Sequence, residues 1–278
     1  MISVRNLVLD FQTSEETRHV LDNLSLEIAD GEFVALMGAN GSGKTSLARC
    51  LNGILTPTFG EVIVDGLNTR NANELAEIRR RLGMVFQNPD NQIVAPTVER
   101  EIAFGPENLG VPRVEMRRRV EMLLELFHLE THRQQAPHLL SGGEKQRLAL
   151  AAVMAMQPRH IIFDEPTSLL DYESRCQALE LMQQLVSSPN SFSAQPLTIL
   201  LITQFPEETL FARRLLVMDH GRLVMDGPPV KIFQRVDELH QLALRAPIEF
   251  IAHQEFLRSR NGISAIPPIE DFLLSPIL

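Results

Sequence analysis

The chain has 278 residues, of which 44% are hydrophobic and 22% charged, and its formal net charge is −9. This composition supplies enough apolar side chains for a folded core and excludes a disordered, collagen-like or disulfide-stapled chain. The excess of acidic residues gives no overall attraction to nucleic acid or to an anionic membrane. The two cysteines, Cys50 and Cys176, form no CxxC pair, so we expect them to behave as small apolar side chains in a reducing compartment.

The beginning of the chain predicts the start of an α/β core. We expect strands over the first 30 residues, broken by a polar turn at 13–18. Residues 32–37 form a short apolar run that leads into the glycine-rich run GANGSGKT (38–45), and residues 46–51 have helical character. A buried strand, a glycine turn and a helix in this order are typical of a sheet covered by helices.

The middle of the chain is expected to form a helical subdomain, at about residues 88–157, inserted into this core. Its clearest element is an amphipathic helix at 114–129. We expect Pro106 and Pro112 to break regular secondary structure on the approach to that helix.

Two later apolar runs, at 161–163 and 197–202, have the length of buried strands and end in polar residues. Polar groups after the carboxyl ends of such strands mark where open α/β sheets bind ligands. After about Pro229 the chain changes to short amphipathic pieces, which we interpret as a small C-terminal appendage at 231–278. The candidates for a dimer contact in this appendage are its apolar residues Ile248, Phe250 and Phe256.

The glycine-rich run 38–45 has every part of a phosphate-binding loop. Glycines let successive backbone N–H groups curl around the β- and γ-phosphates, and the following helix presents its positive end to the same anion. Lys44 would neutralise phosphate charge, and the Thr45 hydroxyl would be a magnesium ligand. A glycine turn with a chance Lys-Thr pair is the alternative, but the strand before it and the helix after it favour binding of a nucleoside triphosphate.

Asp164 and Glu165 follow the second apolar run and supply carboxylates for the same site. Asp164 can hold magnesium, directly or through water, and Glu165 is placed to activate the attacking water as a general base. Alone, an Asp-Glu pair at a strand end is more often a solvated turn. In a chain that binds a triphosphate, the catalytic role is favoured.

The segment LSGGEKQR (140–147) predicts a second anion site. Ser141 can cap a helix at 144–156, and the exposed start of that helix attracts an anion. A capped helix with a glycine entry is the structural alternative. Because one chain cannot readily wrap two such sites around a single γ-phosphate, we expect two chains packed head to tail, each supplying one half of each site.

Together, these motifs resemble those of the nucleotide-binding subunits of ABC transporters, in order from Phe11 to about Asp226. The resemblance implies an α/β P-loop fold at 1–230, with an N-terminal antiparallel β portion, and it implies ATP and Mg²⁺ as ligands. The matching motifs are Walker A at 38–45, Walker B at 161–165, the signature at 140–144 and the D-loop at 168–171, which contains Asp171.

The resemblance also implies roles for single residues. Phe11 lies where the family stacks an aromatic ring on adenine, although a lone Phe before a turn is as readily a core residue. Gln87 lies where the family's Q-loop glutamine contacts magnesium and senses the membrane partner. The implied ATP-binding residues are Phe11, Gly38, Asn40, Gly41, Ser42, Gly43, Lys44, Thr45 and Ser46. The implied magnesium ligands are Thr45, Gln87 and Asp164. The implied signature residues, acting on the partner's ATP, are Ser141, Gly142, Gly143 and Glu144.

Position 204 departs from the family pattern. The family usually has His there, where it contacts the γ-phosphate and supports the attack, but this chain has Gln204. Glutamine can donate a hydrogen bond but cannot carry the proton of an imidazole. Either Gln204 is a working substitute beside the catalytic Glu165, or this chain's own site hydrolyses slowly and its signature serves a second site on a non-identical partner.

Residues 85–93 and 97–110, and more loosely the tail, are similar to the ATPase subunits of energy-coupling factor importers of vitamins and cobalt. The resemblance implies a second ATPase subunit, identical or paralogous, together with a transmembrane scaffold protein and a membrane substrate-binding protein. It therefore implies ATP-driven uptake of a vitamin or a transition-metal ion, with this chain on the cytoplasmic face of the membrane. Residues 88–96 would then form a groove for an apolar partner helix; the alternative is an exposed loop with Ile93 and Val94 packed inward.

Two other functions are weighed against this one. The ATPase subunit of a conventional binding-protein-dependent importer is the main alternative. A soluble ABC ATPase acting on nucleic acid or ribosomes fits less well, because the chain has one phosphate-binding loop and no sustained heptads between its motifs. The arginines at 117–119 lie between Glu115 and Glu121, which favours a solvated helix face over nucleic-acid contact. The transported substrate is not specified by any residue of this chain.

Overall fold

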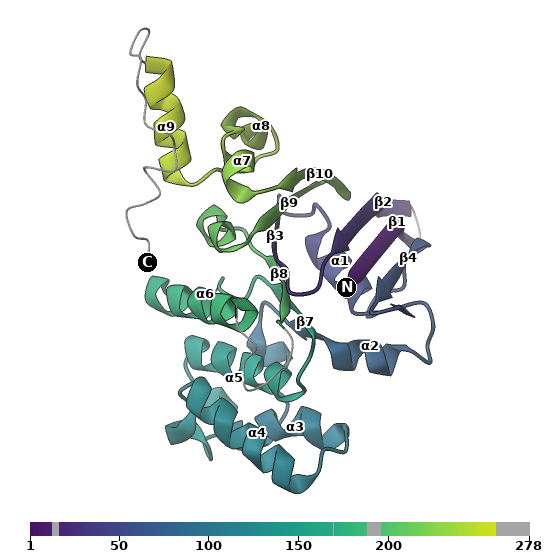
Figure 1. Ribbon diagram of the computed structural model, residues 1–278, viewed down its shortest axis with the longest axis vertical. Helices are drawn as coiled ribbons and strands as arrows, with labels where there is room; N and C mark the ends of the chain where they lie inside the picture. Colours follow the sequence, from purple (N-terminus) through teal and green to yellow (C-terminus); the bar gives the residue numbers. More distant parts are fainter. Residues whose placement is uncertain (13–16, 169, 188–195, 260–278) are drawn as a thin grey trace.

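Two sheets with helices around them build the chain in its computed structural model, which describes residues 1–12, 17–168, 170–187 and 196–259 (Figure 1). An antiparallel sheet has the order β2-β1-β4-β5, formed by β1 (Ile2–Gln12), β2 (Thr17–Ile28), β4 (Phe59–Val64) and β5 (Leu67–Asn68). A six-stranded sheet has the order β10-β9-β3-β8-β7-β6, formed by β3 (Phe33–Gly38), β6 (Leu82–Val85), β7 (His160–Asp164), β8 (Thr198–Ile202), β9 (Arg214–Asp219) and β10 (Arg222–Gly227).

The centre of the six-stranded sheet is parallel and buried on both faces. Every residue of β3, β7 and β8 is buried, which is why these strands are continuous apolar runs in the sequence. Along β3 the side chains alternate between two cores: Val34 and Leu36 face the core shared with the antiparallel sheet, and Ala35 faces the other. Since β8 lies between β3 and β7, the carboxyl ends of all three strands meet at one edge of the sheet, as the sequence predicts for a ligand site.

Helices cover this sheet and extend beyond it. Their bounds are α1 (Lys44–Leu51), α2 (Leu75–Arg81), α3 (Val98–Asn108), α4 (Arg113–Leu126), α5 (Gly142–Ala155), α6 (Tyr172–Ser187), α7 (Pro229–Phe233), α8 (Val236–Gln241) and α9 (Ile248–Ser259). Figure 1 shows α3, α4 and α5 together at one end of the molecule, with α7, α8 and α9 at the other. None of the helices in the described residues is both long and apolar enough to cross a membrane.

The helices of the middle region differ in two places from the prediction. Pro106 does not break the secondary structure but lies inside α3. It lies two residues before the last residue of the helix and is buried, so the one hydrogen bond that proline removes is offset by packing. The helix predicted at 114–129 ends at Leu126, and His128 then takes a left-handed backbone with φ of 52°.

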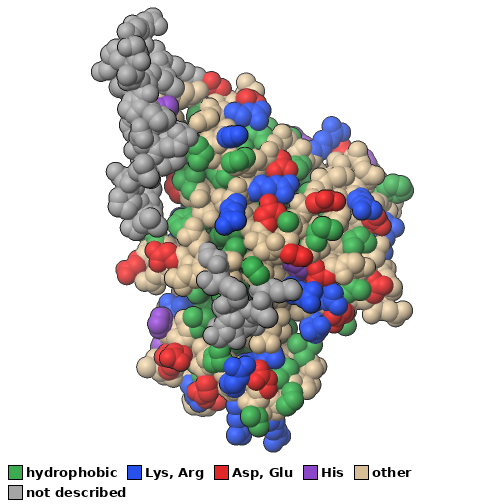
Figure 2. Space-filling view, viewed as in Figure 1, with side chains coloured by type: hydrophobic (Ala, Val, Ile, Leu, Met, Phe, Trp, Pro, Cys, Tyr) green, Lys and Arg blue, Asp and Glu red, His purple; other side chains and the backbone are tan. Residues whose placement is uncertain are grey.

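Of the arginines at 117–119, Arg117 and Arg118 are exposed, as predicted, whereas the side chain of Arg119 is only 14% exposed and donates to the carbonyl oxygen of Ala155 at 3.0 Å. Arg118 and Arg119 both form ion pairs with Glu115, at 2.8 and 3.0 Å. Figure 2 shows Lys and Arg side chains interspersed with Asp and Glu over the face in view. A surface mixed in this way does not present a stripe of positive charge to a phosphate backbone.

The C-terminal helices share the core of the rest of the chain, and this corrects one expectation. Phe250 is only 2% exposed and packs its ring on Phe233, with 5.4 Å between ring centroids. It therefore cannot contact a second subunit, because its alternation with exposed residues on α9 directs it into this chain's own core. Ile248 is 67% exposed and stays a candidate, while the side chain of Phe256 lies outside the described residues.

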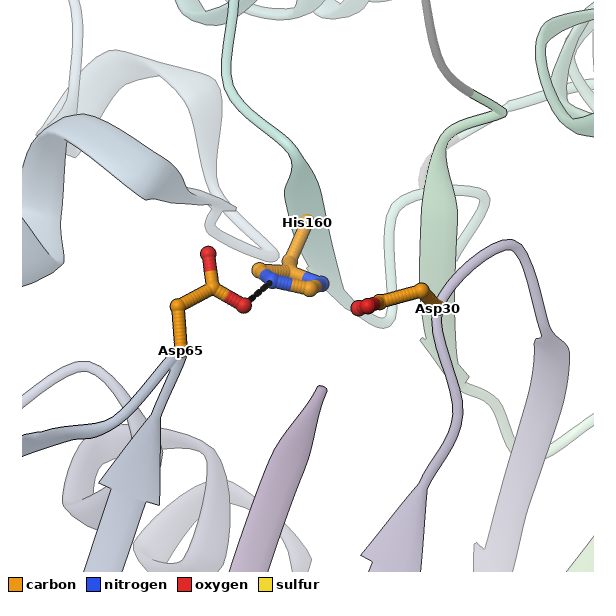
Figure 3. Close-up of side chains that lie close together, drawn as sticks. All are labelled: Asp30, Asp65 and His160. Atoms are coloured by element: carbon orange, nitrogen blue, oxygen red, sulfur yellow. Dashed lines mark hydrogen bonds and ion pairs between the residues drawn. The ribbon is translucent and has the colours of Figure 1, made fainter.

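A buried histidine links the two sheets at the edge opposite the ligand site. His160, the first residue of β7, lies between Asp65 and Asp30, which follow β4 and β2 (Figure 3). Its Nε2 is 3.0 Å from Asp65 Oδ1, and its Nδ1 has no hydrogen-bond partner among the described residues. The ammonium group of Met1 forms ion pairs with both carboxylates. Burial lowers the pKa of His160, more than the hydrogen bond to Asp65 raises it.

This histidine predicts a pH dependence of stability. Because the folded-state pKa of His160 lies below its ordinary value of about 6.5, the unfolded chain takes up a proton first as the pH falls. The free energy of unfolding should therefore decrease from about pH 6.5 downward. In the His160→Gln variant, whose amide can still donate to Asp65, we expect a shallower decrease. Urea unfolding at several pH values measures this, and parallel curves for the two proteins would contradict it.

Candidate nucleotide site

The glycine-rich loop closes tightly around the first residues of α1. Gly43 has a φ of 106°, and a Cβ there would lie 2.9 Å from the carbonyl oxygen of Val20. A Cβ on Gly38 would lie 2.4 Å from the carbonyl oxygen of Met218. Only glycine fits both positions. The Ser42 hydroxyl is buried and has no hydrogen-bond partner among the described residues, so the loop has an unsatisfied polar group that suits an anionic ligand.

The side chain of Lys44 folds back over this loop. Its Nζ donates to the carbonyl oxygens of Gly38 and Ala39, at 2.7 and 3.1 Å. Burial lowers the pKa of Lys44, while Glu165 and Asp164 act in the opposite direction. The ammonium group is thus held inside the loop by neutral carbonyl partners, which anionic phosphate oxygens can replace with stronger bonds.

Thr45 and Asp164 form the pair expected for magnesium. The Thr45 hydroxyl donates to Asp164 Oδ1 at 3.1 Å, across the boundary between α1 and β7. Burial raises the pKa of Asp164, and the hydrogen bond from Thr45 lowers it. A hydroxyl and a carboxylate side by side offer the hard oxygen ligands that Mg²⁺ prefers.

Two amides hold the carboxylate of Glu165. The Nε2 of Gln87, after β6, donates to Glu165 Oε2 at 3.0 Å. The Nε2 of Gln204, after β8, donates to Glu165 Oε1 at 2.7 Å. Glu165 itself has a left-handed backbone with φ of 52°, a conformation that costs free energy for a residue with a side chain and occurs often at functional sites. The sequence placed all three residues at the site but did not predict that they contact one another.

Phe11 lies at the mouth of the site rather than in the core. A cavity of about 410 Å³ extends beside the glycine loop. Phe11 is 42% exposed there, so it is not a core residue, and its ring is available to stack on a nucleobase. The residues lining the cavity are Phe11, Arg18, Val20, Asn40, Gly41, Gly43, Lys44, Thr45, Ser46 and Glu165. The sequence did not predict Arg18 and Val20 as residues of this site. They line the cavity because β2 pairs with β1, which sets Arg18 opposite Phe11.

The signature residues contribute nothing to this cavity in the described parts of the chain. Ser141 caps α5, as predicted: its hydroxyl accepts the Glu144 N–H at 3.3 Å, and its own N–H donates to the Glu144 carboxylate at 2.8 Å. Gly142 is exposed like Ser141, so the start of this helix faces solvent. The start of α5 therefore lies apart from the cavity beside the glycine loop.

The remaining predicted residues lie near these sites. Asp171 accepts the Ser174 N–H at 2.8 Å at the start of α6 and does not line the cavity; residue 169 of the D-loop lies outside the described residues. In the loop at 88–96, Ile93 packs against the core, whereas Val94 is 65% exposed. The loop alternative is thus wrong for Val94, which leaves an apolar side chain available to a partner.

The chain is similar to ATP-binding proteins of transport systems. Residues 21–168 match the family model described as ABC transporter. The chain is 43% identical over 247 residues to the energy-coupling factor transporter ATP-binding protein EcfA1 of Clostridioides difficile, covering 89% of this chain and 87% of that protein. It is 49% identical over 247 residues to the cobalt import ATP-binding protein CbiO of Syntrophus aciditrophicus, covering 89% and 85%.

Solved structures show the same likeness. The structure of cbiO1 from Clostridium perfringens, part of the ABC transporter complex cbiONQ, matches with a TM-score of 0.75 and 29% identity over 91% of this chain and 98% of that chain. The dimeric post-hydrolysis structure of the ATP-binding cassette MJ0796, bound to ADP and Pi, matches with a TM-score of 0.73 and 28% identity over 82% and 99%.

Proposed function

This chain belongs to the ABC transporter family, among the ATP-binding proteins of energy-coupling factor transporters, and on that premise we propose that it drives uptake of a vitamin or a transition-metal ion by hydrolysing ATP. One observation carries the proposal: among the residues described, the cavity is lined by the phosphate-binding loop, by Thr45, which is hydrogen-bonded to Asp164, and by Glu165, but by no signature residue. Each ATP would therefore need a signature from a second subunit.

The residues present fit ATP and Mg²⁺. Glycine allows the loop its tight course at positions 38 and 43, where a Cβ would clash with carbonyl oxygens of this chain. The Ser42 hydroxyl, which has no partner among the described residues, and the Lys44 ammonium group offer donors to phosphate oxygens. Thr45, Asp164 and Gln87 would hold Mg²⁺, which neutralises phosphate charge when bound. The exposed ring of Phe11 would stack on the adenine.

Hydrolysis follows from the position of Glu165. Its carboxylate would take a proton from the attacking water as the water oxygen forms a bond to the γ-phosphorus and the bond to the bridging oxygen breaks. Gln87 and Gln204 hold the two carboxylate oxygens by their amides, which orients the base toward the loop. Lys44 and the backbone N–H groups of the loop would stabilise the charge on the phosphate oxygens.

Two subunits would close head to tail on ATP. In the closed pair, Ser141 and the exposed start of α5 in one subunit complete the site of the other, and loss of the γ-phosphate removes contacts across the interface. The opening and closing would move a partner helix seated near Gln87 and Val94. We assign the ATPase unit to residues 1–230, with a helical subdomain at about 88–157. The appendage at 231–278 would add a dimer contact, with Ile248 as its exposed apolar candidate.

Gln204 would make this chain's own site slow. Its amide donates to Glu165 but, unlike imidazole, carries no titrating proton. In the Gln204→His variant we expect single-turnover hydrolysis to rise by about tenfold or more. An unchanged single-turnover rate would instead show that Gln204 replaces the family's His without loss of rate. A companion subunit with a faster ATP site would then not be needed.

The transport function is tested by purification from detergent-solubilised membranes. We expect a tagged chain to carry with it a second ATPase, a transmembrane scaffold protein and a small membrane substrate-binding protein. The chain would then act as a peripheral subunit on the cytoplasmic face of the membrane. Recovery of a pair of multi-helix permeases instead would favour a conventional importer. Recovery of ribosomes or nucleic acid would contradict a transport role.

A further inference from the structure

A buried carboxylate lies close behind the catalytic edge of the sheet. Glu208, in the short helix Pro206–Phe211, is only 1% exposed. Burial raises its pKa, and hydrogen bonds from two threonines lower it. Its Oε1 accepts from the Thr167 hydroxyl at 2.6 Å, and its Oε2 accepts from the Thr203 hydroxyl at 2.5 Å. The two oxygens are thus bound to two different segments of the chain.

Those segments are the ones that hold the catalytic side chains. Thr167 lies two residues after Glu165, and Thr203 directly precedes Gln204. The Thr203 hydroxyl also accepts the N–H of Phe205 at 3.0 Å, so the backbone on both sides of Gln204 is held. Glu208 therefore links the segment that carries Glu165 to the segment that carries Gln204, whose side chains are hydrogen-bonded to each other.

An arginine connects the same cluster to the D-loop. Arg175, in the first turn of α6, has its Nε 3.5 Å from Glu208 Oε1. Its guanidinium carbon lies 3.7 Å from the centroid of the Phe205 ring. Its backbone N–H donates to the carbonyl oxygen of Asp171, in the D-loop. The side chain of Arg175 thus links the segment next to Gln204 to the first turn of α6, which directly follows the D-loop.

Stability alone does not account for a charged cluster at this place. A buried carboxylate with an arginine loses much solvation, and apolar side chains of similar volume often stabilise a fold equally well or better. What the cluster provides instead is direction, since two hydrogen bonds and an ion pair fix three segments relative to one another. Directional support of this kind matters most for groups whose small displacement slows a reaction.

We propose that Glu208 is a positioning residue for ATP hydrolysis, which holds the segments of Glu165 and Gln204 in the relative placement that hydrolysis needs. The inference rests on the catalytic roles given to these two residues in the proposed function. Glu208 does not touch the nucleotide cavity, so it acts only through Thr167 and Thr203.

The test compares Glu208→Gln with Glu207→Gln in the full chain. Glu207 is the exposed neighbour and serves as the matched control. For Glu208→Gln we expect the single-turnover rate at saturating ATP and Mg²⁺ to fall by about 10- to 100-fold. The Kd of a fluorescent ATP analogue should stay within about twofold, since Lys44 and its loop lie on other segments. Glu207→Gln should match the wild type in both.

A second pair of variants separates positioning from general loss of structure. Thr203→Val keeps the shape but loses the hydroxyl, and Thr203→Ser keeps the hydroxyl. We expect the Thr203→Val variant to hydrolyse ATP as slowly as Glu208→Gln does, and the Thr203→Ser variant to keep most of the wild-type rate. A wild-type rate in Glu208→Gln, or rate and ATP affinity that fall together with Tm, would overturn the inference. A wild-type complex that binds ATP without hydrolysing it, or a Glu165→Gln variant as active as the wild type, would overturn the proposed function and its premise here.

Discussion

Replacement of Glu165 by glutamine is expected to lower the rate of ATP hydrolysis by about 10²- to 10⁴-fold. Glutamine keeps the size of the side chain but cannot accept the proton of the attacking water. ATP affinity should change little, because the phosphate-binding groups are Lys44 and the backbone of its loop. The change also replaces the acceptor of both amides, so the hydrogen bonds from Gln87 and Gln204 must rearrange.

Single-turnover hydrolysis and equilibrium binding of ATP measure this effect separately. Because the variant would bind ATP without consuming it, we also expect it to stay in the closed two-subunit state, visible as an ATP-dependent increase of molecular mass in size-exclusion chromatography. Hydrolysis within a fewfold of the wild-type rate would exclude Glu165 as the general base. Loss of ATP binding would instead show that it supports the site structurally.

The second large effect appears when two inactive variants are mixed. Lys44→Ala removes the cation of the phosphate-binding loop, and Ser141→Arg fills the start of α5, so each variant alone should be inactive. In a head-to-tail pair made of one copy of each, both changes fall in the same composite site and the other site is intact. If copies of this chain pair freely, about half of the pairs are mixed and the mixture should recover about a quarter of the wild-type rate.

This recovery depends on the arrangement of the subunits and on nothing else in the fold. Thermal unfolding of each variant is the control, because Ser141 also forms the capping box of α5 and its loss costs roughly 1 kcal/mol. Mass measurement must show mixed pairs in the mixture. Mixed pairs without activity would mean that both halves of a working site belong to one chain.

Much of the candidate site could be predicted from the sequence because its parts are local. The glycine loop, the Asp164–Glu165 pair and the Ser141 cap each occupy a few consecutive residues with a fixed chemical purpose. The meeting of the glycine loop with Asp164 and Glu165 could also be predicted, because carboxyl ends of parallel strands share one edge. The contact between Gln204 and Glu165 could not, since it depends on β8 lying next to β7 although the two strands are far apart in the chain.

Several residues whose role depends on tertiary burial were predicted wrongly or missed. A proline such as Pro106 favours the end of a helix, but its burial near the end of α3 outweighs the one lost hydrogen bond. Phe250 on a short amphipathic helix is equally suited to a dimer contact and to a core, and Phe233 decides for the core. Glu208 gives no local signal, because its partners Thr167, Thr203 and Arg175 come from three elements.

The central claim is that one chain holds only complementary halves of an ATP site, and dilution tests it most directly. We predict that the rate of hydrolysis per chain falls as the purified ATPase, alone or with its companion subunit, is diluted through the range where pairs dissociate. Analytical ultracentrifugation under the same conditions identifies that range. A rate per chain that stays constant down to concentrations at which only single chains are present would contradict the claim.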